Sequence, residues 1–242
     1  CHFPALQPAA RLAHASENPP ARALSPASAH ASPYNAAMNK NFPPRHAPGR
    51  ARRAPALPPL PAGSLGEALM VASDGLNAVL RGYALNDGLQ GLWRAWPSLT
   101  PASRGAVQDL LYGTLREGPR GAATLAALLE RPLSDTRTEA LLQLALYRLA
   151  TRPDTAHTVV DQAVEVAARL AEGRFKGLVN AVLRNALRQG AELQAHLDED
   201  PEARWRHPHW WINAVQRQHP EHWQAILDGN NSHPPMSLRV NP

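Results

Sequence analysis

The stretch Arg174-Phe-Lys-Gly-Leu-Val-Asn-Ala-Val-Leu-Arg-Asn-Ala-Leu-Arg188 carries an apolar face and a basic face on one predicted helix. At the helical period, the apolar side collects Phe175, Leu178, Val179, Val182, Leu183 and Ala186. The other side collects the cations Arg174, Lys176, Arg184 and Arg188. Because the apolar side can pack while the cations stay available to phosphate groups, the stretch predicts a helical domain with a surface for RNA.

The same helical periodicity extends over residues 64–190. Within this region, residues 137–150 are apolar nearly all round, which predicts the central and most buried helix of a bundle. No alternating run rich in Val, Ile or Tyr occurs before Met236. The fold class is therefore predicted to be all-α.

Several residues predict where helices begin and end. Ser64 and Glu67 form a capping box at the start of the first helix. Thr100-Pro101 supplies an N-cap followed by proline at the first helical position of a second helix. Asn86-Asp-Gly88 is expected to end the first helix.

Positive charge and proline are concentrated in the leading part of the chain. Residues 1–63 carry seven Lys or Arg residues against one acid, Glu17, together with 13 of the 24 prolines. The formal net charge of the whole chain is +5, so the remainder is close to neutral. A segment of this composition buries too little apolar surface to offset the entropy of ordering it. Residues 1–63 are therefore predicted to form a disordered Pro/Ala/Arg-rich arm, and Met38 is a candidate start of translation.

Several segments occur in the order found in one known family. Lys176-Gly-Leu-Val-Asn-Ala-Val-Leu-Arg-Asn185 resembles the last core helix of NusB-like RNA-binding domains. The most similar version is the one fused to RsmB/Sun-type small-subunit ribosomal RNA cytosine C5-methyltransferases. Leu110-Leu-Tyr-Gly-Thr-Leu-Arg116, Leu141-Leu-Gln-Leu-Ala-Leu-Tyr-Arg148 and Pro153-Asp-Thr-Ala-His157 resemble earlier segments of that domain. The resemblance covers about 64–242 and is specific through the order of its motifs.

Two later segments favour the methyltransferase branch of this family. They are His207-Pro-His-Trp-Trp211 and Asn230-Asn-Ser-His-Pro-Pro-Met-Ser-Leu-Arg-Val-Asn241, and they are similar to the linker and first strand of the enzyme. A free-standing NusB-type factor would be expected to end soon after the 175–189 helix. The expected parts are a disordered basic arm (1–63), a NusB-like RNA-binding domain (64–190), a small helical linker subdomain (191–229) and the start of the methyltransferase domain (230–242).

The resemblance implies an S-adenosylmethionine-dependent enzyme in which this part positions ribosomal RNA for a catalytic domain expected in cis after Pro242. Such enzymes bind the cofactor at a Gly-rich strand-to-helix turn and attack cytosine with a cysteine thiolate. This sequence has no G-x-G-x-x-G motif, and its only cysteine, Cys1, lies in the arm. The 242 residues alone are therefore expected to hold no cofactor and to be inactive.

RNA contacts are expected on and near the 174–188 stretch. No acid lies between Arg174 and Glu192, so the cations there are unneutralised, and arginines around the second helix extend the patch. The expected RNA-binding residues are Arg174, Lys176, Arg184, Arg188, Arg104, Arg116 and Arg120. The residues alone also allow a solvated face, the usual fate of a charge run. The family resemblance favours RNA.

The segment after residue 190 is rich in Trp and His. Trp205, Trp210, Trp211 and Trp223 are expected to pack within a small subdomain rather than stack on bases. His219 and His222 have helical spacing, but Pro220 separates them and no acid completes a ligand set. No metal is therefore expected.

Composition argues against other classes of protein. A single cysteine excludes an internal disulfide, and no apolar run approaches the roughly 20 residues that span a bilayer. A cytoplasmic location without membrane contact is expected. The arm is Arg-rich and acid-poor like a transit peptide, but its scattered prolines would break an amphipathic helix.

Two other functions stay open at this stage. One is a stand-alone NusB-like transcription antitermination factor, which would bind RNA together with a ribosomal protein and regulate transcription. Residues 205–242 argue against it. The other is a helical protein-interaction module, which the near-neutral charge of 64–242 allows.

Overall fold

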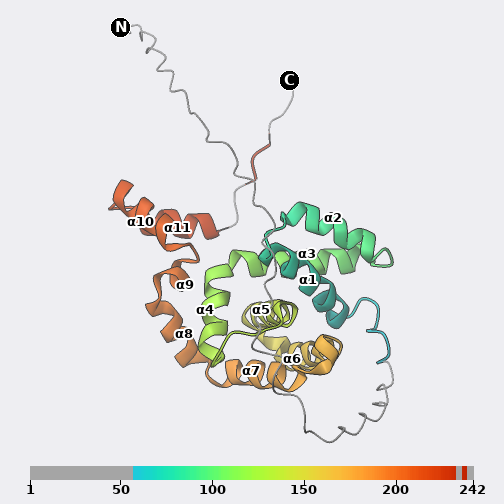
Figure 1. Cartoon of the computed structure of the whole chain (residues 1–242). Helices are drawn as coiled ribbons and strands as arrows, with labels where there is room; N and C mark the ends of the chain where they lie inside the picture. The colour runs from blue at the N-terminus through green and yellow to red at the C-terminus, as the bar shows by residue number, and fades with distance from the viewer. Residues whose placement is uncertain (1–56, 233–235, 239–242) are drawn as a thin grey trace, which may run out of the picture. The chain divides into compact units, whose positions relative to one another are not determined.

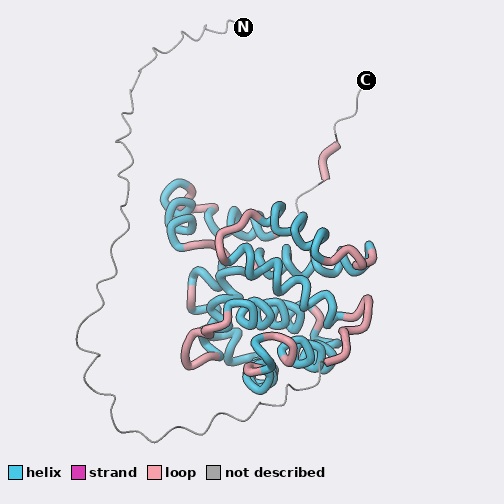
Figure 2. The backbone as a smooth tube through the Cα atoms, turned by 45° about the vertical axis from the view of Figure 1, so that its right-hand side comes forward, coloured by secondary structure: helices cyan, strands magenta, loops and turns pink. Residues whose placement is uncertain are grey.

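The computed structural model describes residues 57–232 and 236–238, and every regular element in them is a helix (Figures 1 and 2). The α-helices are α1 (Leu65–Leu80), α2 (Leu85–Ala95), α3 (Pro101–Arg116), α4 (Gly118–Leu128), α5 (Thr136–Thr151), α6 (Ala156–Ala167), α7 (Lys176–Arg188), α8 (Gly190–Glu199), α9 (Pro201–Trp205), α10 (His209–Gln218) and α11 (Trp223–Asn231). Two 3-10 turns, η2 (Pro153–Thr155) and η3 (Ala171–Gly173), flank α6. The predicted all-α fold class is confirmed. None of these helices has the length and apolar character needed to cross a membrane.

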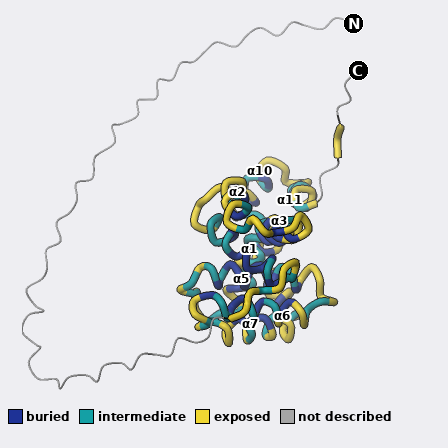
Figure 3. Tube along the Cα trace, turned by 90° about the vertical axis from the view of Figure 1, so that its right-hand side faces the viewer, coloured by how far each residue is buried: buried dark blue, intermediate teal, exposed yellow. Residues whose placement is uncertain are grey.

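Helix α5 is the centre of the bundle, as its all-round apolar sequence predicts. Helices α1, α3, α4, α6 and α7 contact it from different sides (Figure 1). Its Leu141, Leu142 and Leu144 are fully buried in one continuous core. In Figure 3 the buried positions gather along α1 and α5, and the exposed positions lie on the outer turns. Burial of α5 on every side is therefore what holds the surrounding helices together.

The predicted helix caps are present. The Thr100 Oγ1 accepts a hydrogen bond from the Ser103 N–H (3.1 Å) at the start of α3. The Ser64 Oγ accepts one from the Glu67 N–H (3.1 Å) at the start of α1. The Glu67 carboxylate differs from the capping-box expectation, because it accepts from the Gly63 N–H (2.8 Å) rather than from Ser64. Both caps satisfy backbone donors that the first helical turn leaves unpaired.

The prediction that Asn86-Asp-Gly88 ends the first helix is wrong. Helix α1 ends at Leu80, and Gly82 follows it with a φ of +95°, a conformation that favours glycine. Asn86-Asp-Gly88 instead lies in the first turn of α2, where the positive end of the helix dipole favours a carboxylate such as Asp87. Leu89 and Leu92 bury this extra helix against the core. Leu89 and Leu92 are three positions apart, which is typical of one face of a helix, and this spacing was the sequence signal for α2.

The residues just before α1 contact the bundle. Leu60 packs against the main core, and the Pro58 carbonyl accepts a hydrogen bond from Arg169 Nη2 (2.6 Å). Residues 57–63, assigned to the arm on composition, therefore contact the folded part. The rest of the predicted disordered arm, 1–56, lies outside the described residues.

The predicted helical linker after α7 consists of α8 to α11. Helices α8 and α9 pack against α4, and α10 pairs with α11 around Ile212, Val215 and Leu227. Trp205 and Trp223 pack on that small core, edge to face with their ring centroids 5.0 Å apart. Trp210 and Trp211 are exposed (69% and 36%), so the expectation that all four tryptophans pack in the subdomain is wrong for these two, because the buried face of α10 carries Ile212 and Val215. Their rings lie edge to face with each other, with centroids 5.7 Å apart.

Helices α3 and α5 approach closely at Gly113. The Tyr147 ring of α5 occupies the space that a Cβ at Gly113 would need. Gly113 is the glycine of the 110–116 segment that resembles the NusB-like family. A glycine is favoured at this position because the Tyr147 ring lies directly against the backbone of α3, where a side chain would clash.

Replacing Leu144 with Ala is expected to lower the free energy of unfolding by about 2–5 kcal/mol, because a cavity would form at the centre of the bundle. Denaturant unfolding measures this change. The matched control is Leu80→Ala at the exposed end of α1, where we expect a change below about 0.5 kcal/mol. An equally small effect at Leu144 would contradict the central place of α5.

Replacing Gly113 with Ala is expected to destabilise the bundle by about 1–3 kcal/mol, because Tyr147 must move to admit the methyl group. Alanine is otherwise the better helix former by about 1 kcal/mol. The control is Gly105→Ala on the same helix, where the new Cβ meets open space and a stabilisation is expected. Urea unfolding measures the change in the free energy of unfolding for both variants, which should be negative for Gly113→Ala and positive for Gly105→Ala. Changes of the same sign would refute the packing argument.

Candidate nucleic-acid interface

Helix α7 buries the apolar side that the sequence predicts. Val179, Val182 and Leu183 are buried against the bundle, whereas Leu178 lies at the edge of this side, 36% exposed. The helix begins at Lys176, so Arg174 stands in the turn before it. The four predicted cations of this stretch are all exposed.

These four cations do not all line the same hollow. Arg174 and Arg188 line a cleft between α7 and residues 128–134, which join α4 to α5. Arg184 lines a separate hollow between α6 and α7. Lys176 lines neither of these two hollows.

Hydrogen bonds along α7 hold two of these arginines toward different hollows. The Arg184 Nε donates to Asn180 Oδ1 (2.9 Å), and both residues line the hollow beside α6. The Arg188 Nη2 donates to Asn185 Oδ1 (3.2 Å), and both residues line the cleft beside 128–134. The sequence pattern correctly identified exposed basic residues, but these residues line different hollows.

The cleft beside 128–134, here called the α7 cleft, has a volume of about 840 Å³. Its walls include the apolar side chains of Phe175, Leu178 and Leu133. Three cations line it, Arg131, Arg174 and Arg188, against the single acid Glu130. The cleft therefore combines an apolar floor with a net positive charge.

Arg131 was not among the residues expected from the sequence. It lies between α4 and α5, 43 positions before Arg174, and the fold brings it to the same cleft. The Arg174 guanidinium lies 5.0 Å from the centroid of the Phe175 ring. A half-buried aromatic ring beside guanidinium groups is the arrangement that holds a base and its phosphates in single-stranded nucleic-acid sites.

The other three predicted arginines do not line the α7 cleft. Arg120 forms an ion pair with Asp198 (3.0 Å) and donates to the Ala203 carbonyl (3.3 Å), which ties α4 to the α8–α9 segment. Arg104 lies with its guanidinium 5.4 Å from the ring centroid of Trp93 in α2. Arg116 is exposed at the end of α3. Their contact with RNA stays a prediction, and Arg120 already has protein partners.

The described residues offer no metal site. Among residues 57–232 and 236–238, no three His, Cys, Asp or Glu side chains come together in a group that could hold a metal ion.

Comparison with known proteins agrees with this architecture. The NusB family model matches residues 75–188, from within α1 to the end of α7. The helical bundle is a NusB-family domain. A second model, described as an RsmF/B-like methyltransferase, ferredoxin-like domain, matches residues 207–242. That match begins after the NusB domain and overlaps both the expected linker, 191–229, and the expected start of an enzyme domain, 230–242.

Several similar curated proteins share one name. Ribosomal RNA small subunit methyltransferase B of Pseudomonas syringae pv. tomato is 42% identical over 175 residues, which are 71% of this chain and 38% of that protein. The protein of the same name from Pseudomonas putida is 41% identical over 175 residues, 71% of this chain and 39% of that protein. The Vibrio cholerae protein is 35% identical over 162 residues, 66% of this chain and 37% of that protein. The chain, including its NusB domain, thus spans about 38% of the length of the relatives it matches.

Proposed function

We propose that the NusB domain binds single-stranded ribosomal RNA in the α7 cleft, as part of a ribosomal RNA methyltransferase. The observation that carries this proposal is the rim of Arg131, Arg174 and Arg188 around an apolar floor that includes Phe175. The named relatives support ribosomal RNA as the ligand.

The arginines and the Phe175 ring of the cleft would contribute to binding in different ways. Guanidinium groups contact phosphates and give affinity that depends steeply on salt. The Phe175 ring offers a face on which one base stacks, and stacking tolerates any base. Single-stranded RNA suits this cleft because its bases are free of a helical stack and can reach an aromatic side chain.

For the whole protein, the proposed activity is S-adenosylmethionine-dependent methylation of cytosine C5 in small-subunit ribosomal RNA. The NusB domain would hold the RNA so that one single-stranded or flipped cytosine reaches a catalytic domain in cis. The described residues do not themselves fit the cofactor. They contain no strand and so no Gly-rich strand-to-helix turn, and the only cysteine, Cys1, lies outside them. A cytoplasmic location follows from this proposed substrate.

The NusB match by itself also suits an antitermination factor, the second candidate function. The ferredoxin-like match over 207–242 favours the methyltransferase, since it belongs to an RsmF/B-like family. The third candidate, a protein-interaction module without RNA, is disfavoured by the excess of cations over acids in the α7 cleft.

The variant Arg174→Ala/Arg188→Ala of the 242-residue chain is expected to bind mixed-sequence single-stranded RNA more weakly than the unchanged protein. It should also flatten the dependence of log K on log salt by about 1.4 units, roughly 0.7 for each lost phosphate contact. Fluorescence anisotropy over a series of salt concentrations measures both quantities.

The matched control is Lys176→Ala/Arg184→Ala, which removes two exposed cations of the same stretch that lie outside the α7 cleft. We expect its effect on the salt slope to be clearly smaller. Equal slopes for the two variants would assign binding to the whole basic face rather than to the cleft. If neither variant changed the slope, phosphate contact by α7 would be refuted.

A further inference from the structure

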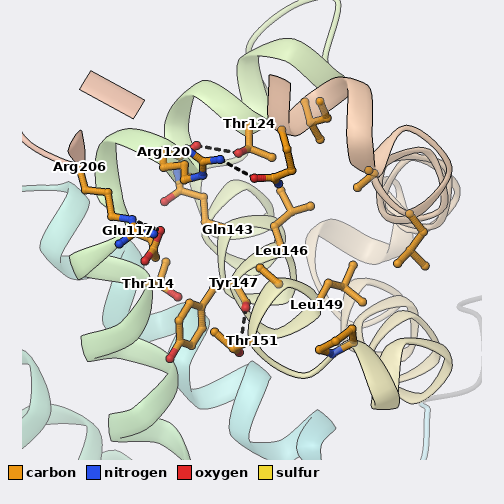
Figure 4. Close-up of a pocket in the computed structure, with 18 of the residues that line it drawn as sticks. Thr114, Glu117, Arg120, Thr124, Gln143, Leu146, Tyr147, Leu149, Thr151 and Arg206 are labelled. Atoms are coloured by element: carbon orange, nitrogen blue, oxygen red, sulfur yellow. Dashed lines mark hydrogen bonds and ion pairs between the residues drawn. The ribbon is translucent and has the colours of Figure 1, made fainter. Parts of the chain in front are cut away.

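A second hollow, with a volume of about 670 Å³, lies among α3, α4, α5 and the α7–α9 segment (Figure 4). It shares no lining residue with the α7 cleft. Its volume falls within the range of about 300–1,000 Å³ typical of small-molecule sites. We call it the α5 hollow, because α5 supplies Gln143, Leu146, Tyr147 and Leu149 to its wall.

Gln143 is the one polar residue in the apolar stretch 140–147 of α5. As a residue Gln143 is 8% exposed and lines the α5 hollow. Its amide keeps some accessible surface and forms no hydrogen bond with a described residue. The Thr114 hydroxyl of α3, in the same wall, is also buried and has no partner among the described residues. Water in the hollow can reach the Gln143 amide, and a ligand that displaces this water must offer the amide a donor or an acceptor in its place.

The remaining walls suit a flat apolar body. Leu146, Leu149 and Leu193 line the hollow, and the Tyr147 ring stands beside Thr114 (Figure 4). Burial, followed by the nearby Asp109 carboxylate, raises the pKa of Tyr147 above its ordinary value.

The rim of the α5 hollow is cationic. Arg120 and Arg206 are paired with Asp198 (3.0 Å) and Glu117 (2.9 Å), respectively. Arg204 is exposed, lies 5.1 Å from the Trp205 ring centroid, and forms no ion pair with a described residue. One guanidinium at the rim thus remains available to an anion.

We infer that the α5 hollow binds one unstacked nucleotide, with the base edge at the Gln143 amide and the phosphate at Arg204. An amide offers both a donor and an acceptor, as a base edge does, and the leucine walls accommodate the apolar faces of the ring. The ligand chemistry is that of a nucleoside monophosphate. Its source is a nucleotide of the bound RNA strand, which rests on the proposed function, or a free nucleotide, and the experiment below distinguishes the two.

The test is Gln143→Leu in the 242-residue chain, with Gln224→Leu on the exposed surface of α11 as the matched control. Leucine is similar in size to glutamine, and the Gln143 amide has no described protein partner to lose, so the unfolding midpoint should change little. Binding is measured by anisotropy for four labelled oligonucleotides, each made of one base. Free nucleoside monophosphates are titrated separately, with chemical shifts as the readout.

The unchanged chain should prefer one base, because hydrogen bonds to a base edge discriminate where stacking does not. Gln143→Leu should bind the preferred oligonucleotide about 3- to 30-fold more weakly, the loss of one or two hydrogen bonds, and should lose the preference. Its salt slope should stay unchanged. Arg204→Gln should instead flatten the slope by about 0.7 units.

The outcomes separate this inference from the proposed function. Loss of base preference in Gln143→Leu supports the site with RNA as its source. Free nucleotides that bind the unchanged chain but not Gln143→Leu, with RNA binding unaffected, support the site and exclude RNA as the source. If Gln143→Leu keeps the full affinity and base preference of the unchanged chain for every probe, the hollow holds only water and the inference is overturned, whether or not Arg174→Ala/Arg188→Ala weakens RNA binding.

Discussion

The apolar surface of α5 is the constraint on which the other elements depend. A helix that is apolar on nearly all sides must be covered on all sides, because each exposed leucine would forgo about 1.5–3 kcal/mol of burial. Helices α1, α3, α4, α6 and α7 provide that cover. Each covering helix turns its apolar side inward, so its polar residues are left on the outside. The basic outer face of α7 is a direct consequence of this arrangement.

The same constraint builds the α7 cleft from distant parts of the chain. Because α4 and α7 both pack on α5, the 128–134 connection after α4 comes to lie beside α7. This is how Arg131 joins Arg174 and Arg188. A large net charge on the described residues is not required for them to attract an anionic nucleic acid. Three cations at one cleft create a local positive field that the near-neutral total conceals.

Patterns local to one helix were predictable from the sequence, and partnerships between helices were not. The extent of α5, the cap at Thr100 and the buried face of α7 follow from residues a few positions apart. Helix α2 was missed because Asn86-Asp-Gly88 favours turns and helix starts alike, and only the packing of Leu89 and Leu92 decides between them. Tertiary neighbours decide which hollow each cation of the 174–188 stretch lines, and they place Asp198 where it forms an ion pair with Arg120. Helical periodicity contains no information about such neighbours.

Gln143 shows how a departure from a local rule points to function. The other residues of the 140–147 stretch of α5 are apolar, and the Gln143 amide has no hydrogen-bond partner among the described residues. A polar side chain at such a position can form hydrogen bonds with water or a ligand in the α5 hollow. The two sites proposed for the domain are then complementary in chemistry. In these proposals, the arginines at the α7 cleft would contact the backbone of any strand, whereas the amide in the α5 hollow would distinguish one base from another. Affinity and selectivity would thus come from different surfaces packed on the same central helix, and each can be altered without the other.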